Sequence, residues 1–210
     1  MNKLGDLSCN EFLTELASAA PAPGGGGGAA MAGALAAALA SMVANLTVGK
    51  EKFADREPEV KELLEQAEAE RVRLLTLVDE DAAVFNSFMS CYKLPKTTDE
   101  EKAARTAAIR AAAKQAATVP LNIARSSFAV LKLAYRLVVS GNPGVITDGA
   151  CSGLLARAAL RCAEYNVRIN LGLTKDEAWN AQAAADLKQL LADAEALETR
   201  LLAVTDKALQ

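Results

Sequence analysis

Hydrophobic residues along much of this chain recur every three or four positions, which is the period of an amphipathic α-helix. Residues 58–92 are the clearest case, with apolar side chains at Leu63, Leu64, Ala67, Val72, Leu75, Val78, Ala82 and Phe85. The other face of the first half of this segment is heavily charged, as expected for a solvated helix face. Strand-like alternation occurs only in the short stretch 167–169, inside helical surroundings. The pattern predicts an all-α protein.

Helix start and stop signals divide this pattern into about six helices. Capping boxes begin at Ser8 and Thr98, each with a glutamate three residues later, and Pro- or Gly-containing segments follow several apolar runs. Pro120 predicts a kink near residues 116–120, because proline offers no N–H to the preceding turn. We expect one helical-bundle domain over residues 1–210. Its predicted helices are a short one after Ser8 and longer ones over about 28–48, 58–92, 98–140, 148–171 and 174–209.

One helix stands apart because residues 29–49 carry no charged side chain. The segment is long enough to cross a membrane, but its alanine and glycine content and its lack of a basic N-terminal flank argue against a span. Asp6, Glu11 and Glu15 precede it, which argues against a signal segment. We therefore predict an Ala/Gly-rich central helix buried in the bundle, and no membrane partner. Small residues that allow neighbouring helices to approach share one of its faces at Gly33, Ala37 and Ser41.

A run of five glycines, residues 24–28, leads into this helix after Pro21 and Pro23. The first N–H groups of a helix lack intrahelical partners, so such a turn can bind an anion with the help of the helix dipole. Glycine equally allows a sharp turn and a close approach by other helices. The local sequence leaves both interpretations open.

The composition narrows the possible chemistry. Hydrophobic residues make up 51% of the chain and aromatic residues only 4%, so the core must be built mainly from Ala, Leu and Val. A net charge of −3 argues against a nucleic-acid partner, which needs a basic patch. There is no histidine, which leaves Asp, Glu, Lys, Tyr and Cys for proton transfer. The four cysteines show no C-x-x-C spacing, so we predict no metal site and interpret them as thiols of a cytoplasmic protein.

Polar residues interrupt the apolar pattern at three places. Asp81 lies one turn before Phe85 on the same helix face, so its carboxylate can line a partly apolar pocket. Each place also has a structural interpretation. Lys50 can complement a helix dipole, Asp148 can be an N-cap, and paired asparagines can satisfy a helix–helix contact. The three places are the glycine turn with Asn45, Thr47 and Lys50 at the far end of its helix; Asp79, Asp81 and Asn86; and Thr147 and Asp148, followed on the next helix by Asn166 and Asn170.

Together, and in this order, these segments resemble the formiminotransferase-cyclodeaminase / methenyltetrahydrofolate cyclohydrolase family. The resemblance begins with the glycine turn, its Pro-x-Pro lead and the alanine-rich helix that ends at Lys50. It departs from the family pattern at Gly27 and Gly28, which replace a serine or alanine and an apolar residue, and at Thr147, which replaces a serine. The matching blocks cover nearly the whole chain and continue through residues 77–86, 94–95, 117–120, 141–143 with 147–148, 158–160 and 166–171.

The resemblance implies a helical, cytoplasmic homodimer that acts on a tetrahydrofolate derivative without a metal or a bound prosthetic group. Two activities occur in the family. The cyclohydrolase adds water to 5,10-methenyltetrahydrofolate and gives 10-formyltetrahydrofolate. The cyclodeaminase closes 5-formiminotetrahydrofolate to the methenyl form and releases ammonia. Because these 210 residues include no formiminotransferase domain, we favour the cyclohydrolase. The alternatives are the cyclodeaminase and a non-catalytic folate-binding or scaffold protein.

Within this resemblance we expect Asp81, Asp148 and Lys50 to be catalytic. Either carboxylate can attract the methenyl cation and deprotonate water, and the lysine can donate a proton or hold an anionic group of the substrate. The glycine turn would direct N–H groups at the glutamate tail or at the pterin edge. We expect the substrate to be bound by Gly24, Gly25, Gly26, Gly27, Asn45, Asn86, Thr147, Asn166 and Asn170.

Overall fold

The computed structural model describes residues 3–210, and within that part of the chain it is a bundle of α-helices with no β-strand. The described chain also has three short 3-10 helices: η1 (Leu4–Asp6) precedes the first α-helix, and η2 (Glu51–Phe53) and η3 (Pro143–Val145) lie between later ones. The prediction of an all-α protein with about six helices is confirmed. The α-helices are α1 (Cys9–Leu16), α2 (Gly25–Asn45), α3 (Glu57–Cys91), α4 (Asp99–Ser140), α5 (Ile146–Thr174) and α6 (Glu177–Ala208).

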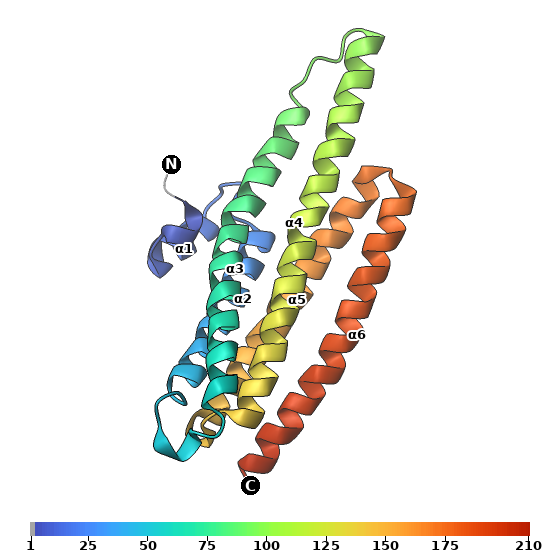
Figure 1. The fold of residues 1–210 in the computed structure, drawn as a ribbon. Helices are drawn as coiled ribbons and strands as arrows, with labels where there is room; N and C mark the ends of the chain where they lie inside the picture. Colours follow the sequence, from blue (N-terminus) through green and yellow to red (C-terminus); the bar gives the residue numbers. More distant parts are fainter. Residues whose placement is uncertain (1–2) are drawn as a thin grey trace.

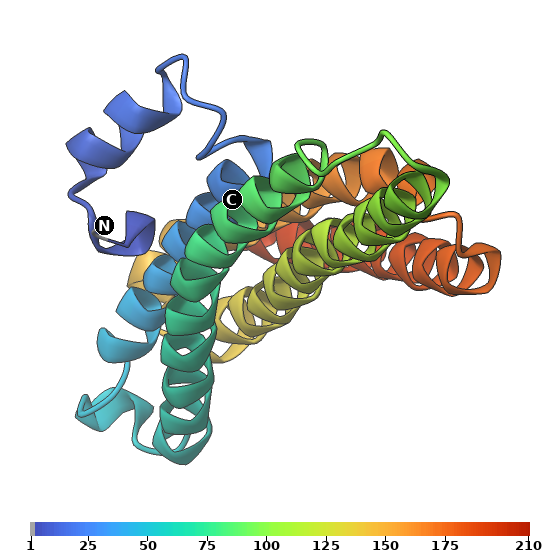
Figure 2. The ribbon, with the colours of Figure 1, turned by 90° about the horizontal axis from the view of Figure 1, so that it is seen from above.

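The five longer helices form two layers. In Figure 1, α3, α4 and α6 lie in front, and α2 and α5 lie behind them. Helix α2 packs against both α3 and α5, while α5 also packs against α4 and α6. The end of α3 and the start of α4 project beyond the other helices, and Figure 2 shows α1 at the edge of the bundle, near the start of α2.

Helix α2 is the central helix that its lack of charge predicts. Ala36, Ala37 and Ala40 are fully buried, and a Cβ on Gly33 would lie only 3.0 Å from the Leu74 side chain. Helix α2 is long and apolar enough to span a membrane, but 61% of its most apolar window is buried inside the protein. Its start differs from the prediction, since the helix begins at Gly25 rather than near Gly28. The glycines therefore form the first helical turn, where close packing outweighs their low helix propensity.

The two predicted capping boxes are present. Ser8 and Glu11 exchange side-chain-to-backbone hydrogen bonds at the start of α1, and Thr98 and Glu101 do the same for α4. Helix α5, in contrast, begins at Ile146, two residues before the predicted start. Asp148 consequently lies in its first turn and is not its N-cap, which is Val145.

The N-terminal segment is attached to α3 through Asp79. Oδ1 of this residue accepts hydrogen bonds from the backbone N–H groups of Leu4, at 2.6 Å, and Gly5, at 3.5 Å. Further along the segment, Phe12 is 2% exposed and belongs to the main core. The chain from η1 to α2 is thus held against the bundle at several points.

Candidate active site

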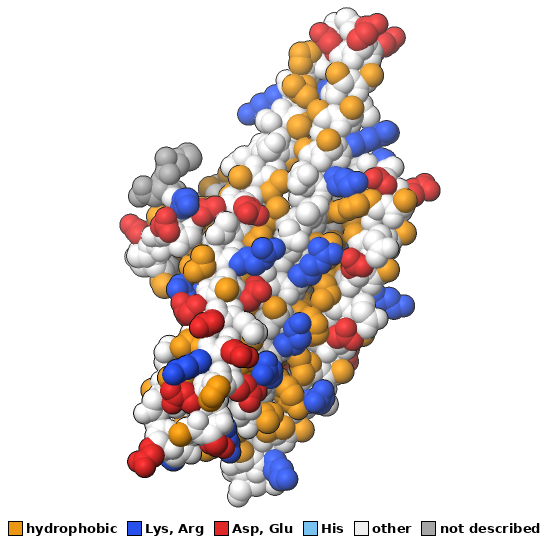
Figure 3. Space-filling view, in the orientation of Figure 1, with side chains coloured by type: hydrophobic (Ala, Val, Ile, Leu, Met, Phe, Trp, Pro, Cys, Tyr) orange, Lys and Arg blue, Asp and Glu red, His pale blue; other side chains and the backbone are white. Residues whose placement is uncertain are grey.

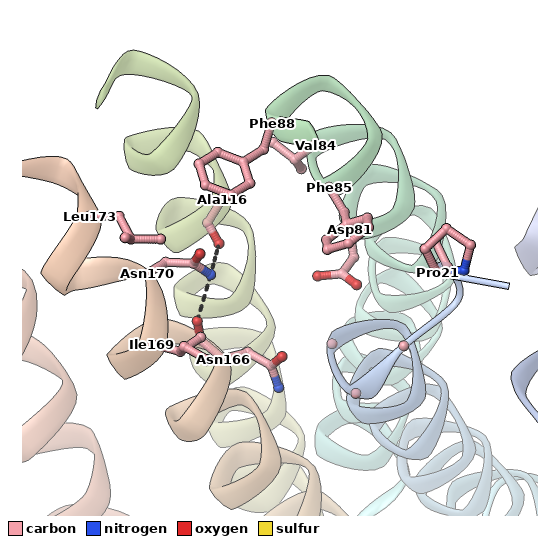
Figure 4. A pocket seen from close by; sticks show the side chains of 14 residues that line it. Pro21, Asp81, Val84, Phe85, Phe88, Ala116, Asn166, Ile169, Asn170 and Leu173 are labelled. Carbon is pink, nitrogen blue, oxygen red and sulfur yellow. Dashed lines mark hydrogen bonds between the residues drawn. The ribbon is translucent and has the colours of Figure 1, made fainter. Parts of the chain in front are cut away.

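A cavity of about 410 Å³ lies where α2 begins, α5 ends, and α3 and α4 pass on either side. Its volume is in the range of small-molecule sites. Figure 4 shows Asp81 of α3 on one side, opposite Asn166 and Asn170 of α5. Gly24, Gly25 and Gly26 line it next to Asp81, so the start of α2 forms part of the wall.

Asp81 lies against the first turn of α2, and this contact depends on glycine. A Cβ at Gly26 would overlap the Asp81 carboxyl group, with only 2.6 Å to Cγ. The backbone N–H of Gly27 donates a hydrogen bond to the same carboxylate. Free N–H groups and the positive end of a helix dipole both favour a negative charge at this position. The glycine turn therefore allows Asp81 to pack closely against α2. The start of this helix also favours a negative charge, and the group that lies there is the carboxylate of Asp81.

Burial nevertheless raises the pKa of the Asp81 carboxyl above the ordinary aspartate value of 3.8, and the hydrogen bond from Gly27 only partly offsets this effect. Among the cavity-lining residues of the described chain, Asp81 has the one ionisable side chain. A carboxyl group with a raised pKa in a small cavity suits proton transfer near neutral pH, because its two protonation states are closer in free energy.

The two asparagines occupy the opposite wall. Asn170 Nδ2 donates hydrogen bonds to the backbone carbonyls of Ala116, at 2.9 Å, and Asn166, at 2.8 Å. Asn166 Nδ2 donates to the carbonyl of Cys162 at 2.9 Å, and its amide lies beside Gly25. The expected helix–helix contact of these side chains is thus present at Asn170, and both residues still line the cavity.

The rest of the wall is apolar and partly aromatic. Phe85 and Phe88 of α3 face Ile169 and Leu173 of α5 across the cavity (Figure 4). Phe88 is held in place by an edge-to-face contact with Tyr92, with ring centroids 5.3 Å apart. Such walls suit a flat aromatic ligand that carries polar groups at its edges.

Several predicted site residues do not lie at this cavity. Asp148 and Thr147 are in the first turn of α5, and Asp148 is 18 residues before Asn166, or about 27 Å along the helix. Asn45 is the last residue of α2 and Lys50 follows that helix, at the same far end of the bundle. Asn86 is on α3 but is exposed and does not line the cavity. Gly27 does not line the cavity either, but its backbone N–H donates a hydrogen bond to Asp81, which does.

At the far end, polar groups mainly complete the helix ends. Asn142 donates its backbone N–H to Thr47 Oγ1, at 2.9 Å, and its side-chain amide to the Leu46 carbonyl, at 3.1 Å. Gly49 has a positive φ of 72° and donates its N–H to Glu57 Oε2. Lys50 is exposed and precedes η2. These contacts give Thr47 and the loop a structural role, and neither Lys50 nor Asp148 lines the cavity beside Asp81.

Sequence reasoning missed several cavity residues. Ile169 and Leu173 are 72% and 39% exposed, which a helical apolar pattern does not distinguish from core positions. Their spacing from Asn166 and Asn170 on one helix face was the available signal. The Ala116 carbonyl gave a second signal, because Pro120 leaves it without its usual helical donor.

This chain is similar to known proteins over most of its length. Residues 8–189 match the family model described as formiminotransferase-cyclodeaminase. The chain is 44% identical to methenyltetrahydrofolate cyclohydrolase of Methylorubrum extorquens, over 94% of this chain and 95% of that protein. It is 34% identical to formimidoyltransferase-cyclodeaminase of Sus scrofa, over 87% of this chain but only 34% of that longer protein.

A solved structure gives the same result for the fold. The crystal structure of formiminotetrahydrofolate cyclodeaminase from Thermotoga maritima superposes with a TM-score of 0.88, at 30% identity and with 98% of both chains covered. The likeness therefore extends over the helices that form the cavity as well as those at the far end. Together with the family match over most of its length, this places the chain in the formiminotransferase-cyclodeaminase family.

Proposed function

We propose that this protein is a methenyltetrahydrofolate cyclohydrolase, which hydrolyses 5,10-methenyltetrahydrofolate reversibly to 10-formyltetrahydrofolate. The observation that carries the proposal is the 44% identity to a cyclohydrolase over nearly the full length of both chains. The cavity supports it, because a half-buried carboxylate faces two asparagines across a partly aromatic space. The proposed chemistry uses side chains and water and needs no metal or prosthetic group.

In this proposal Asp81 is the general base. The methenyl carbon carries a delocalised positive charge between two nitrogens, and a carboxylate beside it stabilises that charge. Asp81 removes a proton from the attacking water as its oxygen bonds to the carbon. The tetrahedral intermediate then collapses: the bond from carbon to N5 breaks, protonated Asp81 returns its proton to N5, and the hydroxyl proton leaves to solvent as the formyl carbonyl forms. One proton is released overall, as the conversion of a cation to a neutral formyl group requires.

The remaining cavity groups bind and orient the substrate. Phe85 and Phe88 offer aromatic surface to the pterin ring, and Asn166 and Asn170 offer hydrogen bonds to its edge. The free N–H groups at Gly25 and Gly26 lie at the helix start, where a substrate carboxylate or the pterin edge is favoured.

The cyclodeaminase is the second candidate, favoured by the likeness to the Thermotoga maritima enzyme over 98% of both chains. Ring closure of 5-formiminotetrahydrofolate passes through a tetrahedral carbon between the same two nitrogens. The same carboxylate can therefore serve either reaction, and only the substrate distinguishes them.

An assay with separate substrates tests the proposal. The purified protein is given 5,10-methenyltetrahydrofolate or 5-formiminotetrahydrofolate, and the methenyl absorbance and ammonia are followed. Loss of absorbance with the first substrate, well above the spontaneous rate, supports the cyclohydrolase. Appearance of absorbance together with ammonia from the second supports the cyclodeaminase. Binding without either reaction would favour a folate-binding scaffold and contradict both enzymatic functions.

We also propose that the protein is a homodimer and that its copies meet through the exposed sides of α2 and α5. Helix α2 has no charged residue, and its outer side exposes Leu35 and Met42; that of α5 exposes Leu154 and Tyr165. The two helices pack together as the back layer of the molecule, whereas Figure 3 shows many charged side chains on the front layer. Two helices of this length and about 10 Å width offer on the order of 700 Å², close to one side of a standard interface.

Such a pairing gives Lys50 and Asp148 a role in the active site of the partner copy. If the two copies pair antiparallel about a two-fold axis at the middle of this face, the far end of one lies beside the cavity of the other. We keep both residues as proposed catalytic groups on this basis, acting from the partner copy. Thr147 and Asn45 are kept as proposed binding residues in the same way.

The Leu35→Glu variant tests the interface. Leu35 is 55% exposed on α2, so the substitution is tolerated in a monomer but buries a charge in the proposed dimer. Light scattering after gel filtration is expected to show a fall from twice the 21.9 kDa chain mass to the chain mass. Val72→Glu is the matched control, since Val72 is also 55% exposed but lies on α3. A monomeric wild-type protein, or a Leu35→Glu protein that remains dimeric, would contradict the proposal.

A further inference from the structure

The side-chain amide of Asn170 is held by two acceptors that fix its orientation. Nδ2 donates to the carbonyl oxygens of Ala116, at 2.9 Å, and Asn166, at 2.8 Å, as the dashed lines in Figure 4 show. A carbonyl oxygen cannot donate, so an amide turned by 180° would place Oδ1 against two acceptors. Both amide hydrogens are therefore used by the protein. Oδ1 is the end that remains for a ligand in the cavity.

Pro120 makes one of these acceptors available. In an α-helix the carbonyl of residue 116 would accept from the N–H of residue 120, and proline has none. Helix α4 nevertheless continues from Asp99 to Ser140 through the buried Pro120. The carbonyl group that Pro120 leaves without a helical donor is that of Ala116, which is one of the residues that line the cavity. An unpaired carbonyl at this position would be costly, and Asn170 satisfies it.

The neighbouring asparagine shows that this arrangement is particular to Asn170. Asn166 Nδ2 donates to one carbonyl, that of Cys162, so one amide hydrogen and Oδ1 both remain for a ligand. Asn166 can offer a donor or an acceptor to the cavity. Asn170 offers an acceptor.

We propose that Pro120 and the Ala116 carbonyl lock Asn170 as a hydrogen-bond acceptor, so that the cavity selects a ligand that presents an N–H group to Asn170 Oδ1. This inference rests on the proposed folate substrate, whose reduced pterin ring carries N–H donors at N3, at N8 and at the 2-amino group. Asn170 is then a specificity-determining residue, and Pro120 is a positioning residue that acts through it. A locked acceptor discriminates more strongly than a free amide, because a ligand without the donor leaves Oδ1 unpaired and the amide cannot turn to compensate.

The test compares tetrahydrofolate with three analogues that each lack one donor. In the first, CH₂ replaces the N8–H group; in the second, a methyl replaces the 2-amino group; and in the third, a methyl replaces the hydrogen on N3. Titration calorimetry is expected to show that the wild-type protein binds at least one analogue about tenfold more weakly than tetrahydrofolate, the effect of one lost hydrogen bond in a cavity. In Asn170→Ala the difference should shrink to about twofold or less, because the acceptor that reads the donor is absent.

Pro120→Ala tests the lock itself. Alanine is a good helix former and restores an N–H that competes for the Ala116 carbonyl, so the variant should fold and should release the Asn170 amide. We expect Pro120→Ala to show a smaller difference in affinity between tetrahydrofolate and the analogues than the wild type shows. Asn122→Ala, two residues away on the same helix, should keep the wild-type difference. Circular dichroism of each variant is the check that it is folded.

The outcomes separate this inference from the proposed function. If Asn170→Ala weakens tetrahydrofolate and the analogues equally, Asn170 has only a structural role and the inference is wrong. If Pro120→Ala keeps the full wild-type discrimination between the ligands, Pro120 does not fix the orientation of the Asn170 amide and that part of the inference is wrong, although Asn170 still acts as the acceptor. If the wild-type protein binds tetrahydrofolate and its analogues equally well, the inference fails while the function stands. If the wild-type protein neither binds nor converts any folate, the proposed function fails and the inference fails with it.

Discussion

Asp81→Asn is expected to lower cyclohydrolase turnover by about 10²–10⁴-fold, the usual contribution of a positioned general acid–base group. Asparagine has nearly the same shape and can still accept the hydrogen bond from the Gly27 N–H, so the start of α2 keeps its support. What it lacks is the negative charge beside the methenyl cation and the ability to take a proton from water. The effect should therefore be much larger on kcat than on KM, and initial rates at several substrate concentrations measure both.

The neighbouring residue provides a control for this variant. Glu80 is exposed on α3 and does not line the active-site cavity, so Glu80→Gln removes one charge from the same turn without touching the site. It should retain nearly wild-type turnover. Asp81→Asn turnover within about threefold of wild type would contradict the role of Asp81 as the base.

The pH dependence of the reaction follows from the direction of the pKa shift. Burial raises the pKa of the Asp81 carboxyl above 3.8, and the base must be deprotonated to act. Turnover should therefore fall as the pH is lowered through this raised pKa, at a higher pH than an ordinary aspartate would give. The residual activity of Asp81→Asn should lack this acidic limb.

The same shift predicts that Asp81→Asn is more stable than the wild-type protein at neutral pH. A carboxyl group with a raised pKa in the folded state binds protons more tightly there than in the unfolded chain. The free energy of unfolding therefore decreases as the pH rises from 3.8 through the folded-state pKa. Asparagine removes this penalty, so thermal unfolding at pH 7 should show a higher Tm for the variant, with the gain disappearing below pH 3.8. A variant that is less active but more stable than the wild type is expected when a functional carboxyl group, here that of Asp81, is held in an unfavourable environment.

Gly26→Ala is expected to lower turnover by at least about 10²-fold, through displacement of Asp81 rather than loss of a chemical group. The added Cβ would overlap the carboxyl group of Asp81, so the side chain or the start of α2 must move. Displacements of about 1 Å at a reacting group can cost this much activity. The overlap should also destabilise the protein, since helix α2 packs tightly at this point.

Gly28→Ala is the matched control for this glycine. It lies in the same turn, and a Cβ there would meet only Leu16, at an ordinary 3.8 Å. Alanine in a helix is about 0.5–1 kcal/mol more favourable than glycine, so the variant should be active and somewhat more stable. Equal turnover in Gly26→Ala and Gly28→Ala would show that close packing on Asp81 does not matter for the reaction.

The sequence predicted most of the fold because its signals are local. The capping residues at Ser8 and Thr98, the helical period of α3 and the uncharged stretch of α2 each act within a few turns. The start of α2 was predicted too late because glycine is a poor helix former when only neighbours in sequence are considered. The deciding contact, between Gly26 and Asp81, joins residues that are far apart in the chain.

The candidate site was predicted in part for the same reason. Resemblance to the family identified Asp81, the glycines and the asparagine pair, and the structure brings these groups to one cavity. The resemblance also grouped Asp148 with Asn166, although both lie on one continuous helix and are about 27 Å apart along it. The helix predicted over residues 148–171 already implied this separation, but grouping residues by their polarity takes no account of it. The locked amide of Asn170 depends on a carbonyl of another helix and has no local signal.

The attachment of the N-terminal segment to Asp79 has a practical consequence for work on this protein. The segment is tied to α3 only two residues before Asp81, and at its other end it runs through Pro21 into the glycines that support the same carboxylate. The N-terminal segment therefore contacts the bundle at two points, and these lie on either side of the proposed base, Asp81. An affinity tag fused ahead of Leu4 adds mass directly at the Asp79 contact, whereas the C-terminal end lies away from the cavity of its own chain, beyond the last turn of α6 (Figure 1). Tags for kinetic work therefore belong at the C-terminus.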